Sequence, residues 1–395
     1  MSGARPPGAG RTAWEAVTTL PALDRRVAAW AQGLDLPFAG QVLWPTGARG
    51  AHPVGGEADA WGEPDGNRAL VLGAPEVQAP DGGGARWRIS VKGVGAWAPM
   101  FHDPPGDAGG SGRLLHAEAW FGESPWGAQG EAPALNGLAV SDEAGGVALA
   151  GMPICPVWQV VRLPEAVVAG AAPARYRAYR GGWWQEHRLV PSTVRLFHHG
   201  AQVLEDGALA ALSALGVADV CALDAFIDRL IATGLAALTL PARTAVDGPG
   251  GPTAYRWSHV WLDKDAVLAP DGALCFADLE GLERAPVAGP EALAALTQRH
   301  VNDHVYEWLY AVDRLLQVRW LGALDPGARV GRRPSAEDAA ADLALRIELA
   351  LAADPFVEVV RTGTSVVLWV RPPAFPSSPI PIALLTGPVV AGGAG

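Results

Sequence analysis

The sequence of 395 residues contains very little lysine and very little cysteine. Lys92 and Lys264 are the only lysines among its 30 basic residues, and the three cysteines, Cys155, Cys221 and Cys275, lie far apart in apolar surroundings. Cysteines without a CxxC motif or a pairing pattern argue against a disulfide framework and a thiolate metal site, and favour a reducing compartment. A GC-rich codon bias explains the scarcity of lysine, but not why both lysines fall inside candidate site segments.

The chain also lacks long apolar runs and an excess of positive charge. No run of about eighteen apolar residues occurs, and the opening segment MSGARPPGAGRTAWEA has no apolar signal-peptide core. The net charge of −11, with scattered arginines, argues against a nucleic-acid binder, which needs a concentrated basic face. We therefore expect a cytoplasmic protein with no membrane and no nucleic-acid partner, whose partner is a protein or a small molecule.

Glycine, proline and apolar residues are abundant instead. The 49 glycines and 34 prolines predict long surface loops, while the apolar content of 49% excludes wholesale disorder. A chain of this length buries a large core and is expected to form two lobes or domains.

Apolar periodicity and turn clusters give a coarse series of predicted elements. In the first part of the chain these are a disordered leader over 1–12, a helical region over 12–33, an irregular segment over 39–67, strands at 68–72 and 86–91, a short helix at 113–121, and strand-like pieces at 138–140, 147–149 and 158–163. In the second part they are helices at 205–215, 223–238, 291–321 and 335–353, a hairpin of strands 356–361 and 365–371, and a mobile tail from residue 372.

The stretch from Tyr255 to Glu283 carries the clearest chemical pattern. In order, it has a polar loop with Asp263, Lys264 and Asp265, a turn at Pro270-Asp271-Gly272, an apolar strand over 273–277, and Asp278. ATP-dependent transferases with a protein-kinase-like fold place a catalytic-loop acid and a metal-binding aspartate at the two ends of such a hairpin, because Mg²⁺ on phosphates needs carboxylate oxygens. The alternative is a solvated hairpin with capping carboxylates.

A second pattern follows the predicted strand at 86–91. This strand ends in Lys92-Gly93-Val94-Gly95, and glycines beside a strand lysine let the backbone approach a nucleotide closely. A kinase-like site also needs a helix glutamate that orients the lysine. Glu118 in the predicted short helix is the candidate and Glu123 is an alternative. The alternative to this kinase-like interpretation is that Lys92 is an edge-strand lysine beside a turn. Glu118 or Glu123 is then a solvated helix carboxylate.

Two further groups of charged or metal-binding residues have spacings that suit the binding of phosphate or a metal ion. Arg188 and Arg195 flank a turn at 191–192, so they can clamp phosphate oxygens, or they are surface arginines at strand ends. His300, His304 and Glu307 share one helical stripe that can bind a divalent metal, but no second ligand set accompanies them.

Several of these segments together resemble the selenoprotein O family of protein adenylyltransferases, which have a protein-kinase-like fold. The segments NRALVLGAPEVQAPDGGGARWRISVKGVGAWAP and AEAWFGE are similar to the family's GRALLLGE strand, GRRWD turn, KGxGxTPYSR strand and SEAMHALG helix. HRLVPSTVRLFHHG is similar to RVAPSHIRFG, SHVWLDKDAVL to AHGVMNTDNMSI, and ADLEG to IDYGP. The resemblance covers about residues 67–320 in pieces and keeps their order.

This resemblance implies specific roles. Lys92 and Glu118 correspond to the ion pair that orients the nucleotide, with Gly93 and Gly95 beside it. Arg188 and Arg195 correspond to arginines that hold a flipped nucleotide, so that the γ-phosphate is buried and the α-phosphate is presented.

The same resemblance assigns Asp265 to the catalytic-loop aspartate and Asp278 to the metal-binding aspartate. The family's metal-binding Asn, however, falls on Ala266, which cannot coordinate Mg²⁺. Either Asp263 or Asp265 then substitutes, or the metal is held more weakly, or the enzyme is degenerate. Lys264 beside these acids neutralises phosphate charge, or forms a surface ion pair of little energetic value.

We therefore expect an α+β, two-lobed, protein-kinase-like fold with a β-rich N-lobe, a helical C-lobe and a C-terminal helix-plus-hairpin appendage. The expected boundaries are 1–195, 196–330 and 331–395. The expected activity is transfer of AMP from ATP, with Mg²⁺ or Mn²⁺, to a Ser, Thr or Tyr hydroxyl of a protein substrate. The alternatives are a phosphotransferase and a degenerate nucleotide-binding pseudokinase that acts as an interaction protein.

Overall fold

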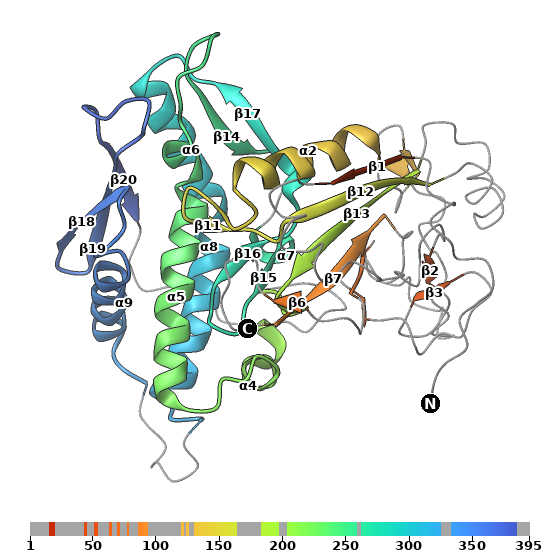
Figure 1. Ribbon diagram of the computed structural model, residues 1–395. Coiled ribbons are helices and arrows are strands. Elements are labelled where there is room, and N and C mark those ends of the chain that lie inside the picture. Colours follow the sequence, from red (N-terminus) through yellow and green to blue (C-terminus); the bar gives the residue numbers. More distant parts are fainter. Residues whose placement is uncertain are drawn as a thin grey trace. The chain divides into compact units, whose positions relative to one another are not determined.

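Figure 1 shows a computed structural model of the chain. It describes residues 16–19, 43–45, 51–53, 63–64, 69–71, 77–78, 86–93, 120–121, 124–125, 130–163, 183–196, 204–258, 262–324 and 333–384. These residues form helices and strands in a mixed arrangement, which confirms the α+β class. Among them, no helix has the length and apolarity needed to cross a membrane.

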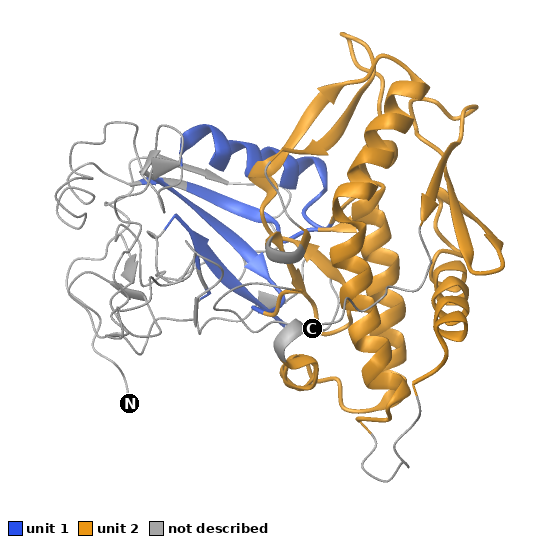
Figure 2. Cartoon of the chain, turned by 180° about the vertical axis from the view of Figure 1, so that it is seen from behind, with its two compact units in different colours: residues 1–147, 154–193, 198–201 blue, residues 148–153, 194–197, 202–395 orange. Residues whose placement is uncertain are grey.

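The chain divides into two compact units, which Figure 2 distinguishes by colour. Unit 1 comprises residues 1–147, 154–193 and 198–201, and unit 2 comprises residues 148–153, 194–197 and 202–395. Each unit has its own sheet or sheets and its own packed interior.

Unit 1 is built on a seven-stranded sheet in which every pair of neighbouring strands is antiparallel. Its order is β1 (Ala16–Thr19), β12 (Val157–Leu163), β13 (Trp183–Val190), β7 (Arg86–Lys92), β5 (Ala69–Val71) and β4 (Glu63–Pro64), with β6 (Val77–Gln78) also paired to β7. The strands predicted at 68–72, 86–91 and 158–163 are confirmed by β5, β7 and β12.

Helix α2 (Glu131–Glu143) packs against strands β12 and β13 of unit 1 (Figure 1). Ser141 fixes this packing, because its hydroxyl donates to the Gly137 carbonyl (2.8 Å) and accepts from the backbone N–H of Val157 (2.9 Å). The strand-like piece predicted at 138–140 is therefore wrong, since these residues lie inside the helix.

Short strands correct three more expectations in unit 1. β1 lies inside the predicted helical region, and β2 (Leu43–Pro45) and β3 (Ala51–Pro53) pair within the segment expected to be irregular. β8 (Trp120–Phe121) pairs with β9 (Ser124–Pro125), where the end of a short helix was predicted. Strand pairing supplies backbone hydrogen bonds that weak local patterns do not reveal.

Unit 2 has α5 (Val220–Leu238) and α8 (Pro290–Trp320) side by side at its centre (Figure 1). Trp308 is fully buried against α5, where its indole N–H donates to the Leu230 carbonyl (3.4 Å). A Cβ atom at Gly234 would lie 2.3 Å from the Trp308 ring, so this close helix contact requires glycine. Both helices confirm the predictions at 223–238 and 291–321.

Smaller elements surround these helices. They are β10 (Ala148–Leu149), β11 (Met152–Pro153), α4 (Leu204–Ala214), α6 (Leu240–Arg243), β14 (Thr253–Trp257), α7 (Leu262–Asp265), β15 (Ala266–Leu268), β16 (Leu274–Phe276), the 3₁₀ turn η4 (Leu279–Gly281) and β17 (Leu282–Pro286). The predicted strand at 147–149 and helix at 205–215 are confirmed by β10 and α4.

The hairpin of β15 and β16 is fixed on α5. Its turn residue Gly272 has φ +89°, a conformation that favours glycine, and a Cβ atom there would lie 2.2 Å from the Phe226 carbonyl oxygen. The Thr233 hydroxyl accepts a hydrogen bond from the backbone N–H of Leu274 (3.0 Å). The hairpin predicted around this turn is thus confirmed, and its contacts with Phe226 and Thr233 fix its position on α5.

The C-terminal part of unit 2 consists of α9 (Ala336–Ala350) and a three-stranded sheet. The Ser335 hydroxyl caps α9 by accepting from the Asp338 N–H (3.1 Å), as its position before the helix predicts. β18 (Val357–Thr362) and β19 (Ser365–Val370) form the predicted hairpin. β20 (Ile380–Leu384) adds a third strand, so the prediction of a mobile tail is wrong for these residues.

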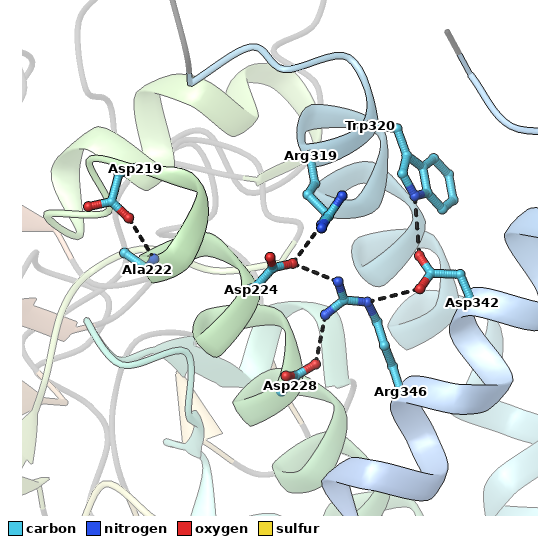
Figure 3. A network of polar contacts seen from close by, with 8 residues as sticks. All are labelled: Asp219, Ala222, Asp224, Asp228, Arg319, Trp320, Asp342 and Arg346. Carbon is cyan, nitrogen blue, oxygen red and sulfur yellow. Dashed lines mark hydrogen bonds and ion pairs between the residues drawn. The ribbon is translucent and has the colours of Figure 1, made fainter. Parts of the chain in front are cut away.

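Ion pairs hold this C-terminal part to the rest of unit 2. Arg346 on α9 contacts three aspartates, and Arg319 and Trp320 of α8 contact two of the same acids (Figure 3). We call this group the α9 anchor: Asp224, Asp228, Arg319, Asp342 and Arg346. Separately, the buried guanidinium of Arg243 pairs with Asp354 (2.7 Å) just before β18.

Candidate functional site

A row of buried polar side chains marks the centre of the unit 1 sheet. Lys92 at the end of β7 lies directly opposite Glu186 of β13 in the antiparallel register. Residues directly opposite each other project from the same face, with Cβ atoms about 5 Å apart. Lys92 is 3% exposed and Glu186 is 1% exposed, so two side chains of opposite charge type are buried on the same face of the sheet.

The next pair on the same face continues this row. Arg188 lies opposite Ser90, and its Nε donates to the Ser90 hydroxyl (3.3 Å). Because side chains two residues apart on a strand share a face, Ser90 and Lys92 line up on β7, and Glu186 and Arg188 line up on β13. We call these four residues the buried quartet.

Lys92 is not on an edge strand. β7 pairs with β13 on one side and with β5 on the other, where Ala69 lies opposite Lys92. The alternative interpretation of Lys92 as an edge-strand lysine is therefore wrong. Gly93 follows it with φ +87°, so the chain turns away from the strand in a conformation that favours glycine.

Helix α2 approaches the Glu186 side chain at Gly137. A Cβ atom at this position would lie 3.4 Å from the Glu186 Oε1 atom and 3.3 Å from a Val157 methyl group. Glycine at this position therefore lets the helix backbone approach the Glu186 carboxylate and Val157 closely. Burying one carboxylate and two cations costs several kcal/mol per ion unless they are paired and hydrogen-bonded. Such a cost is typical of a site kept for chemistry or for conformational specificity.

The opposite face of β13 is also polar and buried. The His187 imidazole contacts Gln159 (Nδ1 to Oε1, 3.1 Å), and burial lowers its pKa to about 3. A neutral imidazole therefore persists at physiological pH.

Two residues of the predicted site fall outside the described residues. These are Gly95 and Glu118, and the alternative Glu123 also lies there. The structure thus places Lys92, Gly93 and Arg188 together on unit 1, and it adds Ser90 and Glu186, which the sequence patterns did not reveal.

Unit 2 holds the acids of the predicted hairpin. Asp265 is 8% exposed at the end of α7, and its backbone carbonyl accepts from the Ala277 N–H (2.8 Å). Antiparallel pairing of Ala266 with Phe276 brings Asp265 and Asp278 to the same end of the hairpin. Asp278 is partly exposed, with φ −103° and ψ 64°. The backbone pairing of the hairpin therefore brings the two acids to neighbouring positions.

Arg195 lies beside this hairpin within unit 2. It forms an antiparallel bridge with Val267, and the preceding Val194 carbonyl accepts from the Leu268 N–H (2.7 Å). Its side chain is 3% exposed. The structure therefore groups Arg195 with Asp265 and Asp278, whereas Arg188 belongs to unit 1.

Asp263 and Lys264 lie in α7 rather than in the polar loop that was expected, because residues 262–265 complete one helical turn. Their side chains are outside the described set. Ala266 is fully buried in β15, which agrees with its apolar character and leaves no ligand at this position.

The described residues can be examined for a set of side chains that could hold a divalent metal ion. Within the described ranges, no group of three or more His, Cys, Asp and Glu side chains is arranged to hold a metal ion. Mg²⁺, however, is commonly bound by one or two carboxylates together with substrate phosphates. The pair Asp265 and Asp278 fits that second mode, in which the nucleotide supplies the other oxygens.

The histidine stripe of α8 has a structural explanation. His300 and His304 both pack against the Trp257 ring, at centroid distances of 4.3 and 4.6 Å, and Trp257 stacks on Phe276 at 4.7 Å. Burial, followed by the charge of His304, lowers the His300 pKa to about 3. These aromatic contacts support the strand that leads into Asp278.

Comparison with protein-family models finds none that matches the chain, and comparison with curated protein sequences finds no significant match. The family resemblance therefore stays a prediction that rests on the residues named above.

Proposed function

We propose that this protein binds ATP with Mg²⁺ through a two-lobed, protein-kinase-like fold and transfers AMP to a hydroxyl group of a protein substrate. The observation that carries the proposal is the buried quartet. A strand lysine followed by a glycine with positive φ, opposite a carboxylate and beside an arginine, matches what nucleotide phosphates require.

Each group has a role in this proposal. Lys92 and Arg188 bind phosphate oxygens, and Arg195 holds the end of the triphosphate that the family resemblance expects to be buried. Asp278, with Asp265 or Asp263, would hold Mg²⁺, which neutralises phosphate charge when bound.

In the transfer step, the hydroxyl oxygen of the substrate attacks the α-phosphorus of ATP. The bond from this phosphorus to the bridging oxygen breaks, and pyrophosphate leaves. Asp265 orients the hydroxyl and accepts its proton. The position of Asp265 at the open end of the hairpin, one residue from buried β15, supports this assignment.

The test uses ATP labelled at either the α- or the γ-phosphate, incubated with the purified chain, Mg²⁺ or Mn²⁺, and a cell extract as a source of protein substrates. We expect α-label on protein with the wild type and none with Asp278→Ala. Asp247→Ala changes an exposed loop aspartate and is the matched control, which should label as the wild type does. Transfer of the γ-label alone would contradict adenylylation and identify a phosphotransferase.

A second candidate is a nucleotide-binding protein without turnover, and the observation that favours it is Ala266. Restoring an Asn here places an amide at a fully buried position, which costs about 1–3 kcal/mol unless it is hydrogen-bonded or bound to metal. If the metal site is weakened but functional, Ala266→Asn should raise α-label transfer at low Mg²⁺. ATP binding without label transfer in either protein would support the non-catalytic function.

A further inference from the structure

Glu186 has no counterpart among the residues that the proposed function uses. It lies on β13, directly across from Lys92, and the two side chains project from the same face of the sheet. Kinase-like sites take the carboxylate that orients their lysine from a helix. Here a strand places a carboxylate beside the lysine.

The surroundings of Glu186 fit a permanent charge partner. Glu186 is 1% exposed, so water contributes little to its solvation, and Gly137 of α2 packs close to its Oε1 atom. Lys92 lies opposite and Arg188 lies two residues further on the same strand. A carboxylate beside two buried cations lowers the cost of burying both of them.

We infer that Glu186 is the positioning residue of Lys92, in place of a helix glutamate. This inference rests on the proposed function, because it concerns the lysine that binds the phosphates. Backbone hydrogen bonds between β7 and β13 fix the separation of the two Cα atoms, so the two side chains are placed side by side before nucleotide binds. Assembly of this part of the site therefore requires no helix movement.

The experiment compares the affinities for ATP and for adenosine by calorimetry, because only ATP has the phosphates that Lys92 contacts. Glu186→Gln removes the charge and keeps the shape. We expect its ATP affinity to fall about tenfold or more, because Lys92 is then no longer held in place for its charge-assisted contact with the phosphates, and its adenosine affinity to stay unchanged. Glu186→Asp keeps the charge and should recover most of the ATP affinity.

Glu118→Gln tests the helix glutamate that the family pattern would use, and it should lose much less ATP affinity than Glu186→Gln. The matched control is Glu131→Gln, which changes an exposed carboxylate of α2 and should bind ATP as the wild type does. The inference is overturned if Glu118→Gln loses as much ATP affinity as Glu186→Gln, if Glu186→Gln binds ATP normally, or if it loses ATP and adenosine affinity equally.

Failure of the wild type to bind ATP would contradict the proposed function, but it would not decide whether Lys92 and Glu186 form a pair. The pair is then tested by urea unfolding of Lys92→Met, Glu186→Gln and the double variant. We expect the two changes to be coupled on the order of tenfold in the unfolding equilibrium constant. Independent effects would overturn the pairing itself.

Discussion

The buried quartet of unit 1 and the α9 anchor of unit 2 are both networks of opposite charges, but they differ in their access to water. Lys92, Glu186 and Arg188 are 1–3% exposed. In the anchor, the Arg346 side chain is 12% exposed, and its partners Asp224 and Asp228 are 30% and 46% exposed (Figure 3).

This difference indicates different uses of charge. Exposed ion pairs each contribute up to about 1 kcal/mol and cost little to make, so they suit the attachment of a helix to a scaffold. Fully buried ions cost several kcal/mol to desolvate and are often no more stabilising than apolar residues of the same volume. Stability alone therefore explains the anchor, whereas the quartet calls for a further reason, which the proposed phosphate site supplies.

The largest effect is expected from Glu186→Leu. This change leaves two cations buried without their carboxylate and should lower the free energy of unfolding by about 3–5 kcal/mol. Urea unfolding at neutral pH measures it. The double variant Lys92→Met with Glu186→Leu removes a charge of each sign and should regain at least half of the loss. A single variant as stable as the wild type would show that the carboxylate does not balance these cations.

A smaller effect of pH should appear in both units. Burial lowers the pKa of His187 and of His300 from 6.5 to about 3. The unfolded state therefore takes up each proton first, so the stability from each neutral imidazole is complete above pH 6.5 and is lost as the pH falls toward 3.

Between pH 7 and pH 5, each histidine should reduce the free energy of unfolding by about 2 kcal/mol. His187→Gln and His300→Gln should each remove that part of the pH dependence, as measured by urea unfolding at both pH values. Equal slopes for the wild type and a variant would show that the replaced imidazole is protonated in the folded state.

The elements that could be predicted from the sequence are those whose pattern is local. Long amphipathic segments such as α5 and α8, and alternating ones such as β7, carry their periodicity in local sequence and were found within a few residues. α2 was missed because Pro133 and Gly137 favour turns. Proline is tolerated in the first turn of a helix, and packing on the sheet outweighs the cost of an internal glycine.

β20 was missed for a related reason. Pro381 disfavours a strand, but β20 is an edge strand, where a missing N–H is tolerated. For the site, Lys92, Arg188 and the hairpin acids were identified by motif and spacing. Glu186 was not, because its role depends on the register between β7 and β13, and a single sequence does not specify which distant strands pair.

Arg346→Ala tests the α9 anchor, the more exposed of the two networks. It removes contacts of 2.6 Å to Asp224 and 2.8 Å to Asp228, and should cost about 1–2 kcal/mol of unfolding free energy, less at high salt. The matched control is Arg361→Ala, which breaks an exposed pair with Glu348 and should cost about 0.5 kcal/mol or less. A loss that is large and independent of salt would mean that the anchor behaves like a buried network.

The smallest effect is expected from acid titration of the anchor. Burial raises the pKa of Asp224, but hydrogen bonds from Arg319 and Arg346 outweigh it, so the net pKa lies below 3.8. Its stabilisation is thus complete above the unfolded value and is lost as the pH falls through the folded pKa. Asp224→Asn should be less stable than the wild type at pH 7 by about 1 kcal/mol or less. The two proteins should converge in urea unfolding as the pH falls below this lowered pKa, because the wild-type carboxylate is then protonated. A difference in stability that persists at this low pH would have to arise from packing. Asp224 would then behave more like the buried residues of the quartet than its exposure indicates.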